Sequence, residues 1–116
     1  MKAEKDLAAG RWGLTGSDDL LEDAVFHAQQ AAEKALKAFL ASREQPFAKT
    51  HELLYLARQC EQLDAEFAAL EPAVCILNPY LSQFRYPGGD ATPDRRQAEE
   101  ALELAAGIVA FVRARL

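Results

Sequence analysis

The clearest pattern of apolar and polar positions runs from Ser17 to Ser42, where apolar residues recur at the spacing of an α-helix. Ser17 offers a capping hydroxyl, and the acidic residues after it suit the positive N-terminal end of a helix. On a helical wheel, one narrow stripe is apolar: Leu21, Val25, Ala28, Ala32, Ala35 and Phe39. Because its centre is alanine, another helix can approach closely there. The sequence therefore predicts one long helix whose stripe faces the core.

The opposite side of this helix is polar, as a solvated face should be, and carries Gln30, Glu33, Lys34 and Lys37. Two apolar residues lie outside the core stripe: Phe26 almost opposite Ala28, and Leu40 about 120° away from it. An aromatic ring among polar residues indicates a contact surface for a second copy or a partner. The other interpretation is a single exposed aromatic without a role. The candidate face consists of Phe26, Gln30, Glu33 and Lys37.

Helical signals continue on both sides of this segment. Residues 2–9 predict a short helix that Gly10, Gly13 and Gly16 interrupt or end, with Trp12 and Leu14 packing back onto the core. Pro46 marks a break after the long helix. Thr50 can cap the next helix, expected over 51–62, with an apolar face of Leu53, Leu54, Leu56, Ala57 and Cys60.

The second half of the chain begins with another start signal at Asp64. Pro72 suits the first turn of a further segment, which we expect to end or kink at Asn78-Pro79. A turn-rich loop over 80–90 follows. Thr92 is the expected cap of the last helix, with Pro93 at its first position. Its predicted buried stripe is Ala98, Ala101, Leu102, Ala105, Ile108, Val109 and Val112.

These elements predict an all-α fold, an up-and-down bundle of about four main helices plus short helical segments. Runs rich in Val, Ile and Thr are absent from the sequence. The chain of 116 residues is 50% hydrophobic, which is enough for one packed core. We therefore expect a single domain over 1–116.

The net charge and the spacing of the cysteines exclude further classes of function. A formal net charge of −5 argues against a protein that coats nucleic acid through bulk electrostatics. Cys60 and Cys75 lack the spacing of a metal or redox pair and are expected to be reduced thiols. No apolar run has the length of a membrane span, and the first residues lack the apolar core of a signal peptide. The expected location is the cytoplasm, with no membrane contact.

The inventory of catalytic residue types is small. The two histidines, His27 and His51, lie in different predicted helices without metal-ligand spacing, so we expect no metal and no cofactor. One loop does combine useful side chains: Arg85, Tyr86 and Asp90. A guanidinium suits a phosphate and a tyrosine ring suits a base, so the loop is a candidate ligand site. The other interpretation is a helix-terminating turn with Tyr86-Pro87 packed against the bundle.

Three runs of residues resemble the prokaryotic HEPN domain proteins. These are FHAQQAAEKALKA from Phe26 to Ala38, Lys-Thr-His-Glu-Leu from Lys49 to Leu53, and Arg85-Tyr86-Pro87 before the last amphipathic helix. The resemblance covers nearly the whole chain in the same order. It implies a helical bundle that usually forms a homodimer. It also implies pairing with a minimal nucleotidyltransferase as a toxin-antitoxin module, which small members of the family often form.

Many HEPN proteins are metal-independent ribonucleases with an arginine, four to six residues, and then a histidine near the last helix. Arg85 stands at the arginine position, but the position due for histidine is Asp90. An aspartate anion cannot donate a proton to the leaving 5′-oxygen. Lys49 and His51 are further ligand-binding candidates, and His51 would supply an imidazole if the fold placed it near Arg85.

The favoured interpretation is therefore a dimeric, non-catalytic module that binds a nucleotide or a nucleotidyltransferase partner near Arg85 and Tyr86. The alternative is a metal-independent ribonuclease toxin that uses Arg85 in a dimer cleft to cleave RNA. A third possibility is a structural dimer without a ligand site.

Overall fold

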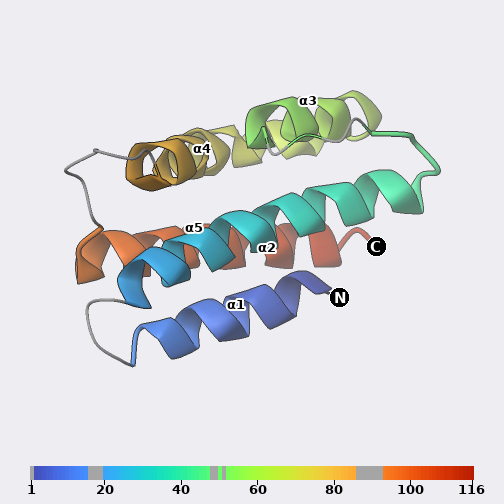
Figure 1. Ribbon diagram of the computed structural model, residues 1–116. Helices are drawn as coiled ribbons and strands as arrows, with labels where there is room; N and C mark the ends of the chain where they lie inside the picture. The colour runs from blue at the N-terminus through green and yellow to red at the C-terminus, as the bar shows by residue number, and fades with distance from the viewer. Residues whose placement is uncertain (1, 16–19, 48–49, 51, 86–92) are drawn as a thin grey trace.

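The chain folds into a helical bundle with one long helix at its centre (Figure 1). The computed structural model describes residues 2–15, 20–47, 50, 52–85 and 93–116. Within these ranges all regular structure is helical, which confirms the predicted all-α class. The elements are α1 (Lys2–Gly13), α2 (Leu21–Ser42), α3 (Leu53–Leu63), the 3-10 helix η2 (Ala65–Leu70), α4 (Glu71–Arg85) and α5 (Arg95–Arg113).

Helix α2 is central because it is apolar around more than half of its circumference. All six residues of the predicted stripe are buried, and so are Ala24, Ala31 and Leu36. α1 covers one side of α2, α5 lies behind it, and α3 with α4 covers the side opposite α1 (Figure 1). Leu40, expected outside the core stripe, is only 1% exposed because α3 and α4 cover that side as well. The predicted cap at Ser17 lies outside the described residues.

Helix α1 is longer than predicted, since it continues through Gly10 to Gly13. A Cβ atom on Gly10 would lie 2.5 Å from Leu102 Cδ2 and 3.3 Å from the carbonyl oxygen of Ala24. The glycine therefore allows α1 to approach α2 and α5 closely instead of ending the helix. Leu14 packs against the core as predicted, but Trp12 is 75% exposed, so the prediction that it packs inward is wrong.

Helix α3 begins two residues later than expected, at Leu53, and a distant side chain supports its start. The hydroxyl oxygen of Thr50 accepts a hydrogen bond from the Glu52 amide at 3.1 Å, just before the helix. The amide of Leu53 donates to Asn78 Oδ1 at 2.9 Å. Asp64 caps η2 by accepting from the Glu66 amide at 3.0 Å, which confirms the predicted start signal.

Helix α4 begins at Glu71, so Pro72 lies in its first turn as predicted. The expected end or kink at Asn78-Pro79 is wrong as an end, because the helix continues to Arg85. Proline removes one backbone donor from a helix interior. The side chain of the preceding residue, Asn78, joins α4 to α3, because its Oδ1 atom accepts a hydrogen bond from the Leu53 amide.

Helix α5 starts at Arg95 with a capping box formed by Asp94 and Gln97. Asp94 Oδ1 accepts from the Gln97 amide at 2.8 Å, and Gln97 Oε1 accepts from the Asp94 amide at 3.0 Å. The cap is therefore Asp94 instead of Thr92, which lies outside the described residues, and Pro93 precedes the helix. All seven residues of the predicted stripe on this helix are buried. Among the described residues, no helix has the length and apolarity needed to cross a membrane.

Candidate functional site

The sequence places its main candidate ligand site between α4 and α5. Arg85 is the last residue of α4, while Tyr86 and Asp90 lie outside the described residues. The C-terminal end of α4 and the N-terminal end of α5 lie at the same end of the bundle (Figure 1). Arg95 donates a hydrogen bond to the carbonyl oxygen of Leu14, which ties the start of α5 to the end of α1. Arg85 therefore lies at the end of the bundle where α5 begins.

Lys49 and His51, the other two ligand-binding candidates, also lie outside the described residues. Their neighbour Leu53 is bonded to Asn78 in α4. Asn78 precedes Arg85 by seven residues, which is about 10 Å along a helix. The start of α3 therefore lies beside the middle of α4, about two helical turns from Arg85.

The candidate dimer or partner face on α2 forms a strip between α1 and α3. Phe26, Gln30 and Lys37 are half-buried, and the Phe26 ring meets the His27 ring edge to face at 5.6 Å. Glu33 differs from the expectation of a solvated side chain, since it is only 5% exposed. Its carboxylate pairs with Lys37 Nζ at 3.2 Å. Glu33 is buried because on the helical wheel it lies beside the side of α2 that α3 and α4 cover.

Sequence reasoning missed a charged cluster between α1 and α2. Asp6 of α1 is 9% exposed, and its two carboxylate oxygens contact His27 Nδ1 at 3.0 Å and Lys34 Nζ at 2.5 Å. Burial alone would raise the pKa of Asp6, but hydrogen bonds and charge from Lys34 and His27 lower it below the ordinary 3.8. An acidic residue beside the apolar Ala3 and Leu7 is the sequence signal that points to such a pairing.

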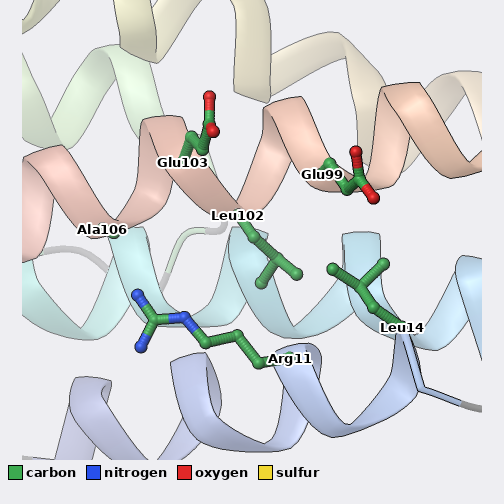
Figure 2. Close-up of a pocket in the computed structure, with 6 residues that line it drawn as sticks. All are labelled: Arg11, Leu14, Glu99, Leu102, Glu103 and Ala106. Atoms are coloured by element: carbon green, nitrogen blue, oxygen red, sulfur yellow. The ribbon is translucent and has the colours of Figure 1, made fainter.

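Sequence reasoning also missed a groove between α1 and α5 (Figure 2). It has a volume of about 320 Å³ and an apolar floor, and its lining residues are Arg11, Leu14, Glu99, Leu102, Glu103 and Ala106. Figure 2 shows Leu14 and Leu102 pointing into the space between the two helices. Residues of α1 contribute one wall and residues of α5 the other, so only the tertiary structure brings them together.

The cysteines and possible metal ligands add no further site. Among the described residues, no three side chains of His, Cys, Asp or Glu lie close enough together to hold a metal ion. Cys60 is buried, and burial raises the pKa of its thiol to about 12, so it is not a thiolate at neutral pH. Cys75 is an exposed free thiol on α4.

Comparison with known families identifies the chain. The family model described as the HEPN domain matches residues 1–115, which is almost the full length. The chain therefore belongs to the HEPN domain family, in agreement with the resemblance found in the sequence and with the helical bundle. No curated protein and no solved structure matches the chain significantly.

Proposed function

We propose that this chain is a dimeric, non-catalytic HEPN module of the cytoplasm that binds a nucleotide or a partner protein. The partner is a minimal nucleotidyltransferase, and the pair forms a toxin-antitoxin module. One observation carries the proposal: a member of the HEPN family has the arginine of the ribonuclease motif at Arg85, and no histidine follows it in the sequence. Asp90, at the position due for histidine, is an anion at neutral pH and does not supply the proton that cleavage needs.

The contact that His27 makes supports a non-catalytic role. The Nδ1 atom of His27 contacts Asp6 in the seam between α1 and α2. This contact occupies that ring nitrogen within the bundle. Arg85 with Tyr86 remains suited to a phosphate and a base, which favours binding without hydrolysis.

The strip on α2 is the face that we assign to the partner protein. Phe26 is a half-buried ring beside the polar Gln30. About three helical turns further along α2, the ammonium group of Lys37 lies 5.6 Å from the ring centre of Phe47. An aromatic anchor within a polar rim is typical of protein interfaces. Glu33 holds Lys37 in place and does not itself offer a free carboxylate.

The catalytic part of the proposal is tested with labelled RNA in EDTA. We expect no cleavage by the natural chain or by Arg85→Ala. Asp90→His restores the arginine-to-histidine spacing. Cleavage by this variant alone would show that the cleft lacks only the histidine. Cleavage by the natural chain that Arg85→Ala abolishes would overturn the proposal in favour of the ribonuclease alternative.

Ligand binding is tested by calorimetric titration of purified chain with a nucleoside triphosphate and with single-stranded RNA. We expect Arg85→Ala to lose binding, because a phosphate contact is worth more than a surface ion pair. Arg58→Ala is the matched control, since Arg58 is an exposed arginine on α3. Equal loss in both variants would show that binding is non-specific and would contradict the assigned site.

The partner face is tested by co-purification with a minimal nucleotidyltransferase. We expect Phe26→Lys to abolish recovery of the partner. Tyr55→Lys places the same charge at a half-exposed aromatic residue on α3 and should leave recovery unchanged. Retention of the partner by Phe26→Lys would remove the α2 strip from the proposal.

A further inference from the structure

The groove between α1 and α5 is bounded at both ends by contacts that cross it. At one end Arg113 of α5 forms an ion pair with Glu4 of α1. At the other end Arg95 donates to the carbonyl oxygen of Leu14. Between these contacts the two helices leave an apolar floor that is open to solvent, with a volume of about 320 Å³.

Three charged side chains line this groove without pairing with one another. Arg11 stands on the α1 wall, while Glu99 and Glu103 stand one turn apart on the α5 wall, and all three are exposed. None of them forms an ion pair with another residue in the part of the chain that the structure describes. Figure 2 shows Arg11 extended along the α1 side and both glutamates on the α5 side. Opposite charges therefore stand on the two walls of the groove without contact.

The two walls are in register. A Cβ on Gly10 would lie 2.5 Å from Leu102 Cδ2, so these two residues face each other across the seam. Arg11 follows Gly10, and α1 and α5 are antiparallel, because Glu4 meets Arg113 while Leu14 meets Arg95. Arg11 is therefore level with the turn of α5 that carries Glu99 and Glu103.

We propose that a second copy of this chain docks on the groove around a twofold axis parallel to α1 and α5. Such an axis places α1 of each copy over α5 of the other, so that Arg11 of one copy pairs with Glu99 and Glu103 of the second. A twofold axis across the groove would instead place Arg11 against Arg11, which is repulsive. An isologous interface requires a self-complementary surface, and the unpaired opposite charges on the two walls provide one.

The surface around the groove fits the close approach of a second helix. One patch on the surface of α5 consists only of small residues: Ala106, Gly107 and Ala110. A Cβ on Gly107 would meet nothing within 4 Å. On α1, Trp12 follows Arg11 and is 75% exposed. A stable interface buries about 800 Å² on each partner, which is more than the groove alone offers. The dimer would therefore include this small-residue patch and Trp12, a residue type that often dominates binding energy.

This inference rests on the dimer of the proposed function and names its surface. Sedimentation equilibrium over a range of concentrations measures the dissociation constant of the dimer. We expect Arg11→Glu to weaken the dimer at least about tenfold, because the two attractive contacts of each Arg11 become repulsive in both symmetry-related halves of the interface. The double variant Glu99→Arg, Glu103→Arg should weaken it similarly. Circular dichroism confirms that both variants keep their helical content.

Mixing the two variants provides the decisive measurement. The glutamate introduced at position 11 of one chain then meets the two introduced arginines of the other, and the unchanged Arg11 meets the unchanged glutamates. We therefore expect a heterodimer with nearly the natural affinity. Arg58→Glu, at an exposed residue of α3 that pairs with Glu71, is the control and should leave the dimer unchanged. The single tryptophan provides a second readout, because its emission should shift on dilution of the natural chain.

Two outcomes would overturn the inference in different ways. A natural chain that dimerises, with neither reversal weakening it, would reject the groove but leave the dimer of the proposed function in place. A natural chain that stays monomeric at all concentrations would reject both. Weakening by each reversal without recovery on mixing would also reject the reciprocal pairing.

Discussion

Helix α1 packs against α2 along one seam and against α5 along another. The two seams differ in whether their charged side chains are paired and in how much space is left between the helices. In the seam with α2, Asp6 is 9% exposed and both of its oxygens are paired. Gly13 lets α1 approach the start of α2 closely, because a Cβ there would lie 3.1 Å from the Leu20 carbonyl oxygen and 3.5 Å from Ala24 Cβ. In the seam with α5, a groove remains, and Arg11 with the glutamates opposite forms no ion pair within the described residues.

The difference follows from the cost of removing charge from water. A buried carboxylate destabilises the fold unless donors replace its water, so the seam with α2 requires Lys34 and His27. An exposed charge remains hydrated and does not need a partner within the chain. The charge in the first seam is therefore paired within the chain, while the charges that line the groove of the second remain hydrated. The following predictions test that contrast, from the largest expected effect to the smallest.

Filling the closest contact should have the largest effect. Gly10→Val adds a branched side chain where a Cβ would already lie 2.5 Å from Leu102 Cδ2 and 3.3 Å from the Ala24 carbonyl oxygen. We expect a loss of about 3 kcal/mol in the free energy of unfolding, the upper end for overpacked cores. Urea denaturation followed by circular dichroism measures it. An unchanged midpoint would show that α1 is free to move away from α2 and α5.

Removing the charge of the paired acid comes next. Asp6→Asn keeps the size of the side chain but weakens its bonds to Lys34 and His27, and we expect a loss of about 1–2 kcal/mol at neutral pH. Glu44→Gln, at an exposed acid after the end of α2, is a control for the change in net charge and should have little effect. Equal stability of the Asp6 variant and the natural chain would contradict a stabilising role for the cluster.

The same cluster predicts a pH dependence. The pKa of Asp6 in the folded chain lies below the ordinary 3.8, so its contribution is complete above that value and disappears as the pH falls through the folded pKa. The stability difference between the natural chain and Asp6→Asn should therefore be present above pH 3.8 and shrink below it. Urea unfolding at several acidic pH values measures the difference. A stability difference between the two chains that grows as the pH falls would contradict a lowered pKa of Asp6.

Replacing a glycine on the exposed side of α5 should raise the free energy of unfolding, whereas Gly10→Val should lower it. Gly107 lies within an exposed helical turn, and a Cβ there would meet nothing within 4 Å. Gly107→Ala should stabilise the monomer by about 0.5–1 kcal/mol, since glycine loses more conformational freedom in a helix. Thermal unfolding at low protein concentration measures this effect without the dimer. A destabilised variant would indicate that the position is covered in the monomer.

The charges of the groove should matter least to the monomer. Arg11→Gln removes a charge that has no partner among the described residues, and we expect the unfolding free energy to change by less than about 0.5 kcal/mol. The same variant should weaken self-association, which analytical ultracentrifugation measures. A large loss of monomer stability would show that Arg11 acts within one chain and would remove the contrast between the two seams.

The candidate site could be predicted only in part. The family follows from residues alone, because the three runs that resemble HEPN proteins are visible in the sequence and the family model matches residues 1–115. The Asp6 cluster joins residues 21 and 28 positions apart, and the groove joins α1 to α5. Such contacts depend on how helices meet, which local pattern does not specify.

Errors in the helix boundaries have a related cause. Thr92 and Asp94 are both acceptable caps, and the Gln97 side chain that completes the capping box decided in favour of Asp94. Asn78-Pro79 favours a break locally, but α4 continues through it while Asn78 bonds to the start of α3. Local sequence patterns therefore identify positions where a helix can begin or end. Which of these positions is used depends on the hydrogen bonds that form in the folded chain.

The sequence by itself determined the helical class, the family and the buried stripes of α2 and α5, because a helix period of 3.6 residues assigns one face to the core. The tertiary structure alone decided the outcome for side chains at the edges of those stripes. Leu40 and Glu33 became buried because α3 and α4 cover a second side of α2, and Trp12 stayed outside because α1 presents Leu14 to the core instead. Periodicity fixes directions around one helix, whereas burial depends on how many neighbours surround it.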